Sequence, residues 1–322
     1  MDKLGRGGDT RSQGLHGDAR TQGPHVDARN QGSHADGRNR APLFEAMVTR
    51  RRLQETSFHV PGHKFGRGLK EDPLAHSSFH AIMELDFTEI DGMDDLHHPE
   101  GIIREAQRLA AECYGAEETF FLVGGSTAGN LALILTVCNP GDLILVQRNV
   151  HKSVLNGLML AGARAVFLAP EWDESERIAG CVKLETIASA LDRYPEAKAV
   201  FLTNPNYYGM GRNLGPVAEL VHRHDIPLLI DEAHGAHFGF HPRLPVSALS
   251  AGADGVVQST HKMGLALTMG SMLHVQGSRM DRQRLKRKLS MIQSSSPSYP
   301  IMASLDISRS LMQTWGTEWL EE

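Results

Sequence analysis

Cysteine, aromatic residues and long apolar runs are all scarce in this sequence. The 322 residues include only three cysteines, Cys113, Cys138 and Cys181, which are too few and too scattered for a disulfide framework or a CxxC metal site. A reducing, cytoplasmic setting is therefore the default expectation. No uncharged run reaches about 18 residues, and the N-terminus has no apolar signal core, so we expect no membrane span and no secretion.

The low aromatic content and the net charge also exclude classes of partner. Aromatic residues make up 6% of the chain, which is thin for a surface that stacks nucleobases or sugars. The formal net charge of -5 implies no general affinity for polyanions, so we expect no nucleic-acid partner. The hydrophobic content of 41% is ordinary for a globular protein, and the length suits about two domains or one large α/β domain.

Residues 1–41 differ in composition from the rest of the chain. A nonapeptide frame, RxQGxHxDx, starts at Arg11 and recurs from Arg20 and Arg29. It contains almost no large apolar residue that could offset the entropy of ordering, so we predict a dispensable, disordered tail. Metal capture by the histidines of the repeats is the alternative, and these are His16, His25 and His34.

From Pro42 onward, short apolar strands alternate with helices, which favours a parallel sheet covered by helices on both faces. The expected strands lie at 119–123, 143–146, 165–168, 199–203, 228–230 and 255–258. The expected helices lie at 100–114, 128–137, 153–162, 184–193, 215–224 and 279–293. The sequence therefore predicts an α/β fold.

Two motifs follow expected strands. Residues 124–130 read GGSTAGN and open a helix, where glycines and free N–H groups suit a phosphate, although a plain tight turn explains the glycines equally well. Asp231 ends the strand 228–230, the edge at which α/β sheets bind ligands. A carboxylate there needs a cation, which could be a protonated pyridine nitrogen, an arginine or a metal. The metal alternative rests on three nearby histidines, His234, His237 and His241.

A third motif, STHK at 259–262, follows the strand 255–258. Lys262 lies there among hydroxyls and a histidine, where desolvation and nearby cations would lower an amine pKa, although a strand-end lysine is also common without a catalytic role. In this order, a phosphate loop, a strand-end Asp231 and Lys262 suggest a pyridoxal phosphate site. His151, which follows the strand 143–146, could stack on such a cofactor or simply cap the next helix.

Five motifs in order resemble the bacterial ornithine/lysine/arginine decarboxylase family, especially its shorter arginine decarboxylase-like members. They are FHVPGHK (58–64), DGMDDLHHP (91–99), RNVHKS (148–153), DEAHGAHFG (231–239) and STHK (259–262). The resemblance covers 42 to about 315. It implies the fold type I, aspartate-aminotransferase-like large domain with a mostly parallel seven-stranded sheet, over 42–314, with 315–322 starting a linker to a missing C-terminal small domain.

The resemblance also implies the cofactor, pyridoxal 5'-phosphate, and the roles of individual residues. Lys262 resembles the Schiff-base lysine, Asp231 the partner of the pyridinium nitrogen and His151 the ring-stacking histidine, while His234 lies at the ring edge. The phosphate ligands would be Ser126, Thr127, Ser259 and His261. No resident metal is implied. Two positions depart from the family pattern, Asn206 in place of threonine and Met269 in place of glutamine.

The implied activity is α-decarboxylation of a basic amino acid, arginine before lysine or ornithine, to carbon dioxide and a polyamine precursor. Relatives form the active site across a dimer, so we expect at least a homodimer. Two alternatives remain, another fold type I pyridoxal phosphate reaction (transaminase or lyase) and a truncated, non-catalytic cofactor-binding remnant.

Overall fold

The computed structural model describes residues 37–53 and 55–322. The nonapeptide repeats, with His16, His25 and His34, lie outside the described residues, so the predicted tail remains a prediction. By internal contacts the chain divides into two units, Met1–Ala35 and Asp36–Glu322. Within this described part, no helix is long and apolar enough to cross a bilayer.

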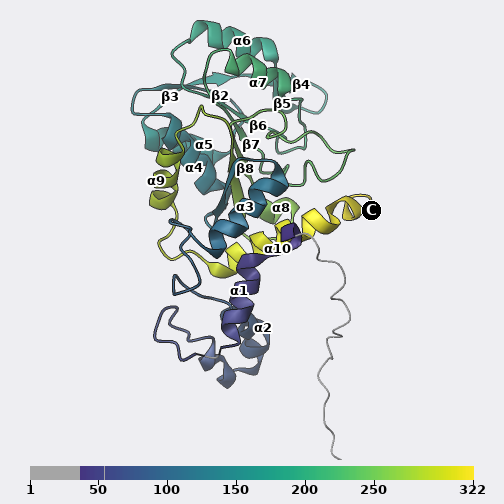
Figure 1. Cartoon of the computed structure of the whole chain (residues 1–322). Helices are drawn as coiled ribbons and strands as arrows, with labels where there is room; N and C mark the ends of the chain where they lie inside the picture. Colours follow the sequence, from purple (N-terminus) through teal and green to yellow (C-terminus); the bar gives the residue numbers. More distant parts are fainter. Residues whose placement is uncertain (1–36, 54) are drawn as a thin grey trace, which may run out of the picture. The chain divides into compact units, whose positions relative to one another are not determined.

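A seven-stranded sheet forms the centre of the second unit (Figure 1). Its strand order is β1-β9-β8-β7-β6-β2-β3. Strands β8, β7, β6, β2 and β3 run parallel, whereas β9 is antiparallel to both neighbours. The strands are β1 Glu118–Leu122, β2 Leu143–Gln147, β3 Arg164–Leu168, β6 Val200–Thr203, β7 Leu228–Asp231, β8 Gly255–Gln258 and β9 Ser271–Val275. The prediction of a mostly parallel seven-stranded sheet is confirmed.

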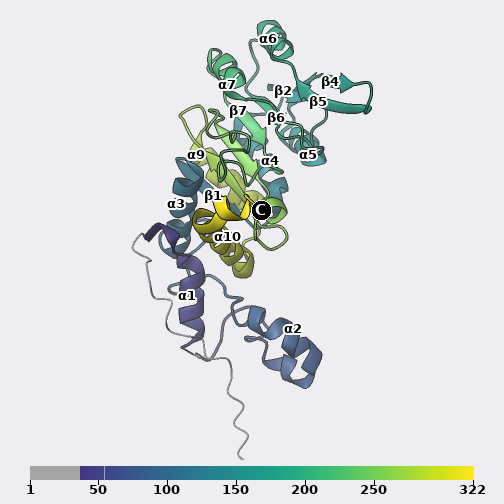
Figure 2. The ribbon, with the colours of Figure 1, turned by 90° about the vertical axis from the view of Figure 1, so that its right-hand side faces the viewer.

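Helices cover both faces of the sheet, as the sequence predicts. Successive strand residues face opposite sides, so Leu228 and Ile230 of β7 join one buried cluster and Leu229 joins the other. The first cluster includes side chains of α1 Pro42–Arg51, α3 Ile102–Tyr114, α6 Leu184–Arg193, α7 Gly215–His222 and α10 Tyr299–Trp319. The second includes α4 Gly125–Val137, α5 Lys152–Ala161 and α9 Arg282–Ile292. Figure 2 shows α3 and α5 on opposite sides of the strands.

Several elements were not predicted from the sequence. They are β9, the hairpin of β4 Pro170–Asp173 and β5 Ile178–Val182, α2 Pro73–Met83, α8 Thr260–Met263, the short 3-10 helices Gly37–Asn39 and Arg67–Glu71, α1, and most of α10. Two of the predicted helices end at a glycine with a positive φ. Helix α3 ends at Gly115 (φ 74°) and α5 at Gly162 (φ 62°).

The N-terminal end of the described unit is anchored by α10. Arg309 is fully buried and donates to the carbonyl oxygens of Arg38 and Arg40 and to Asp306. Asp306 Oδ2 accepts from the Leu43 backbone N–H at 2.9 Å and so caps the start of α1. Residues 38–40, which the sequence division placed in the tail, therefore pack against the folded unit.

Candidate active site

The three predicted motifs lie at one edge of the sheet. Strands β1, β7 and β8 run in the same direction, because β1 and β8 are both antiparallel to β9 and β7 is parallel to β8. The GGSTAGN loop follows β1, Asp231 ends β7, and the STHK motif follows β8. Open α/β sheets bind ligands at this carboxyl edge.

The glycine-rich loop places the N-terminus of α4 at this edge. Gly124 is the N-cap and provides no side-chain cap, so the first N–H groups of this 13-residue helix remain available to an anion. Gly125 has φ +74°. A Cβ on Gly129 would lie 2.8 Å from Leu122 and 2.9 Å from Val257, so α4 packs directly on the sheet. Ser126 is half-buried and Thr127 is exposed in the first turn.

Buried hydroxyl groups gather where β8 ends and β9 begins. Ser259, Thr260 and Ser271 are buried, and their side-chain oxygens have no hydrogen-bond partner. His261 Nδ1 lies 3.0 Å from the Gly270 carbonyl, so Nδ1 carries the hydrogen and Nε2 remains free for a ligand. Orphaned buried hydroxyls beside a helix N-terminus are groups that a phosphate would satisfy.

Asp231 is buried at the end of β7, on the face of the sheet that α4 covers. Its Oδ2 accepts from Asn130 Nδ2 at 2.9 Å and its Oδ1 from the Ala233 N–H at 3.1 Å. Burial raises the pKa of Asp231, while these two hydrogen bonds and the charges of His151 and Lys262 act in the opposite direction. Asp231, His151 and Lys262 are therefore close enough to interact electrostatically.

His151 begins α5 and is tied to the same network. Its Nδ1 accepts from Ser153 Oγ at 2.8 Å and from the Ser153 N–H at 3.2 Å. Ser153 Oγ in turn accepts from Asn130 Nδ2 at 3.0 Å. His151 is thus the side-chain cap of α5, as one interpretation of the sequence proposed, and its exposed ring remains free at Nε2.

Lys262 and His234 face each other across the edge. Lys262 Nζ lies 3.3 Å from His234 Nε2. Burial and then the charge of Lys262 lower the pKa of His234, so the neutral imidazole can accept a hydrogen from Nζ. The ring of Tyr207 packs edge-on against His234 with centroids 5.8 Å apart.

The structure thus brings together the predicted strand-end residues Lys262, Asp231, His151 and His234. Two linking residues, Asn130 and Ser153, were not assigned a role from the sequence. Both lie inside motifs identified from the sequence, GGSTAGN and RNVHKS. Asn130 also follows Ser126 by one helical turn, and this spacing was the sequence signal that could have indicated a role for it.

The three histidines of the 231–241 loop have different partners. His234 contacts Lys262, the ring of His237 packs on Phe238 with centroids 4.9 Å apart, and His241 Nε2 lies 2.7 Å from Glu321 Oε1. In the described residues, no group of three or more His, Cys, Asp or Glu side chains is placed to hold a metal ion.

The two departures from the family pattern occupy different settings. Asn206 is buried and holds its own turn, because its Oδ1 accepts from the N–H groups of Tyr208 and Met210, both at 3.0 Å. Met269 is exposed and has a left-handed φ of 75°. Of the two positions, Met269 is the one whose side chain is open to solvent beside the candidate site.

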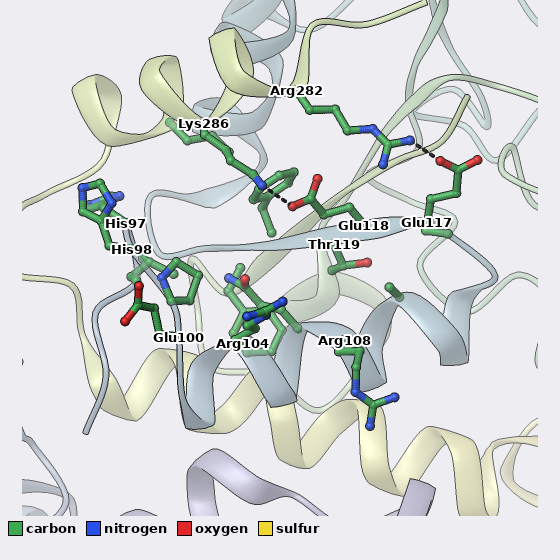
Figure 3. Close-up of a pocket in the computed structure, with 18 of the residues that line it drawn as sticks. His97, His98, Glu100, Arg104, Arg108, Glu117, Glu118, Thr119, Arg282 and Lys286 are labelled. Atoms are coloured by element: carbon green, nitrogen blue, oxygen red, sulfur yellow. Dashed lines mark hydrogen bonds and ion pairs between the residues drawn. The ribbon is translucent and has the colours of Figure 1, made fainter. Parts of the chain in front are cut away.

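A separate cavity of about 730 Å³ lies between α3, β1 and α9 (Figure 3). Lys286 Nζ pairs with Glu118 at 2.6 Å, and Arg282 pairs with Glu117. None of the predicted site residues lines this cavity. Lys286, Arg282 and Arg108 are paired with neighbouring carboxylates, and the cavity lies apart from the predicted site residues, so we assign it no part in the candidate active site.

Comparison with known proteins gives relatives at the level of sequence family and of fold. The family model described as Orn/Lys/Arg decarboxylase, major domain, matches residues 41–322. The chain is 53% identical over 273 residues to the uncharacterized protein YaaO of Bacillus subtilis (84% of this chain, 56% of that protein). It is 40% identical over 282 residues to an arginine decarboxylase of Bacillus cereus (87% and 61%).

A solved structure, lysine decarboxylase A from Pseudomonas aeruginosa, matches with a TM-score of 0.74 and 29% identity, over 87% of this chain and 41% of that one. The chain thus spans only part of the length of these relatives. Its fold is the fold type I, aspartate-aminotransferase-like architecture. The chain belongs to the Orn/Lys/Arg decarboxylase family and corresponds to its major domain.

Proposed function

We propose that this chain forms the pyridoxal phosphate-binding part of a decarboxylase that acts on a basic amino acid. Arginine is the first candidate, because relatives 40–42% identical to this chain are named arginine decarboxylase. Lysine and ornithine follow, and the products would be carbon dioxide and a polyamine precursor. The observation that carries the proposal is the grouping of Lys262, buried Asp231 and His151 at one sheet edge.

The residues present fit the cofactor. The α4 N-terminus with Ser126 and Thr127, and the orphaned hydroxyl of Ser259 with His261 Nε2, would hold its phosphate. Asp231, whose ionised form is opposed by burial, would gain a cation in a protonated ring nitrogen. When bound, pyridoxal phosphate supplies an electron-withdrawing ring that takes up the electron pair left by departing carbon dioxide.

The chain's own groups have distinct tasks in this scheme. Lys262 Nζ would hold the cofactor's aldehyde carbon, and His234 Nε2, 3.3 Å away, would accept or return a proton at Nζ. The exposed ring of His151 would lie against the cofactor ring, with its Nδ1 held by Ser153. Asp231 would keep the ring nitrogen protonated.

A homodimer is part of the proposal. Lys262 is exposed in the single chain, and exposed apolar side chains follow it in sequence, Met263 at 39%, Leu265 at 56% and Met269 at 47%. Exclusion of water strengthens the electrostatic interactions inside an active site and prevents side reactions. A second subunit that covers this edge would provide that exclusion. We expect the assembly to work in the cytoplasm.

Two other functions use the same site, another pyridoxal phosphate reaction and cofactor binding without catalysis. The discriminating experiment measures carbon dioxide release from carboxyl-labelled arginine, lysine and ornithine, with Lys262→Ala as the control. Release from one of the three substrates supports decarboxylation. Amino-group transfer without carbon dioxide release supports a transaminase, and bound cofactor with neither product supports the non-catalytic alternative.

A further inference from the structure

Asn130 links two parts of the proposed cofactor site that come from different elements. Its single Nδ2 group lies 2.9 Å from Asp231 Oδ2 and 3.0 Å from Ser153 Oγ. A carboxamide nitrogen carries two hydrogens, so each can be donated to one of these oxygens. Asp231 lies at the end of β7 and Ser153 in the first turn of α5, and the two are joined through this one amide.

The directions of the hydrogen bonds extend this link to His151. Because Ser153 Oγ accepts from Asn130, its own hydrogen is free to be donated to His151 Nδ1 at 2.8 Å. The Ser153 backbone N–H also points to Nδ1, at 3.2 Å. His151 Nδ1 is therefore an acceptor, and the remaining hydrogen of a neutral ring lies on Nε2.

The amide that makes this link is itself held rigidly. Asn130 is fully buried in α4, next to Gly129, where the helix touches Leu122 and Val257 directly. A buried side chain on a helix packed this closely has little freedom to move. The amide therefore has a fixed position from which to orient its two acceptors.

We propose that Asn130 is a positioning residue, which holds Asp231 directly and His151 through Ser153 in the relative arrangement that a pyridoxal phosphate ring requires. This inference rests on the proposed function and deepens it. In the proposed site, Asp231 would bind the ring nitrogen and His151 would lie against the ring face, so the two residues would have to keep a fixed position relative to each other. The hydrogen bond from Asn130 also favours the ionised form of Asp231.

Two substitutions separate the branches of the network. Asn130→Ala removes both donated hydrogens and affects Asp231 and His151 together. Ser153→Ala removes only the branch to His151, and Ser153→Thr keeps the hydroxyl. Thr136→Ala is the matched control, because Thr136 is a buried polar residue of the same helix whose Oγ1 bonds only within α4, to Ala132 O at 2.6 Å.

The test uses the full chain and two readouts other than activity. Pyridoxal phosphate is titrated into each variant to obtain its Kd, and the visible circular dichroism per bound cofactor reports whether the ring is held in one orientation. We expect Asn130→Ala to raise the Kd about tenfold and to reduce the induced signal. We expect Ser153→Ala to change the Kd less than threefold but to halve the induced signal, with Ser153→Thr restoring it and Thr136→Ala changing neither.

The outcomes separate this inference from the proposed function. A wild-type chain that binds no pyridoxal phosphate overturns both. A wild-type chain that binds it, with Asn130→Ala and Ser153→Ala matching the wild type in both readouts, overturns the inference alone. If Asn130→Ala does not fold by far-ultraviolet circular dichroism, the Ser153→Ala and Ser153→Thr pair decides, because equal signals from the two show that the hydroxyl link has no positioning role.

Discussion

At the scale of single residues, Asp231 shows how burial and function oppose each other. Its carboxylate accepts two hydrogen bonds, yet burial still raises its pKa. A carboxyl whose folded pKa is raised above the unfolded value makes the folded state less stable as pH rises through that interval. A cation placed beside Asp231 would reverse this effect, and the proposed cofactor provides one.

Replacement of Asp231 with Asn tests that role. The variant keeps the size of the side chain but removes the charge that, in the proposed function, would hold a proton on the ring nitrogen. We expect turnover to fall by orders of magnitude, and the increase in thermal midpoint on addition of pyridoxal phosphate to be less than half that of the wild type. Differential scanning fluorimetry with and without cofactor measures the second effect. An unchanged cofactor response together with release of a divalent metal would favour a metal site instead.

Lys262 is the residue on which the assignment of the site depends. Borohydride should reduce the bond between Nζ and the cofactor's aldehyde carbon and fix the cofactor to one peptide, which mass spectrometry identifies. We expect the peptide that contains residues 259–262. Lys262→Ala should abolish labelling without unfolding the chain, because Lys262 is exposed and contributes little to the core.

Lys152→Ala is the matched control, since Lys152 is also exposed and begins α5 beside His151. It should label like the wild type. Labelling at Lys152 or Lys64 would instead place the cofactor elsewhere on the chain.

At the scale of elements, the predictable part of the fold was the part with a strong local pattern. The parallel strands consist of short apolar runs such as 228–230, and both ends of each strand were predicted within one residue. Because parallel strands end at one edge, the sequence order of the motifs was enough to predict that Asp231 and Lys262 would meet. The family resemblance supplied their roles.

The elements that were missed depend on contacts distant in sequence. Strand β9 contains buried His274 and is defined by its pairing with β1 and β8. Helix α10 buries the polar residues Asp306 and Arg309, which pair with each other. Polar residues in a core weaken the apolar periodicity on which the sequence argument rests. The bond from Asn130 to Asp231, 101 positions away, was unpredictable for the same reason.

A buried network of hydrogen-bonded polar side chains also crosses the sheet from β1 to the residue after β7. Thr119 bonds His274 Nδ1 at 2.8 Å, His274 Nε2 bonds Gln258 Oε1 at 3.1 Å, and Gln258 Nε2 donates to Glu232 at 2.8 Å. Burial raises the pKa of Glu232 to about 8 and lowers that of His274 to about 3. Both groups are therefore neutral in the folded protein at pH 7, and the hydrogen bonds of this polar network join uncharged groups.

This polar network predicts that the free energy of unfolding depends on pH. Because the folded pKa of Glu232 is raised, its protonated form favours folding, and stability is lost as pH rises from about 4.5 through about 8. Between pH 5 and pH 9 we expect the wild type to lose roughly 3 kcal/mol more stability than the Glu232→Gln variant, which has no carboxyl to ionise at this position. The Gln258 amide can turn over to match the new side chain.

Urea unfolding at a series of pH values measures this difference. His222→Gln is the control for a substitution at another buried polar contact. His222 pairs with buried Asp254 at 2.8 Å and lies outside the polar network of Glu232. Parallel pH profiles for the wild type and Glu232→Gln would show that Glu232 is ionised in the folded protein.

At the scale of the whole molecule, the folded unit is closed by contacts between its two ends. Asp306 and Arg309 of α10 bind each other at 2.9 Å with both side chains fully buried. Arg309 also binds the carbonyl oxygens of Arg38 and Arg40, and Ser310 Oγ donates to that of Asn39 at 2.6 Å. A buried charge that loses its partners destabilises a fold strongly, so residues 38–40 are structurally part of the folded unit.

Two N-terminal deletions therefore have different expected effects. Removal of residues 2–36 takes away the nonapeptide repeats, whose composition offers almost no apolar surface, and should leave the thermal midpoint unchanged. Removal of residues 2–40 also takes away the carbonyl partners of Arg309 and Ser310. If these bonds contribute about 1–2 kcal/mol, the midpoint should fall by several degrees. Ser310→Ala in the 2–36 deletion, which removes one of the bonds, should give an intermediate value. Calorimetry compares the three proteins with the wild type, and equal midpoints for both deletions would show that α10 does not anchor this segment.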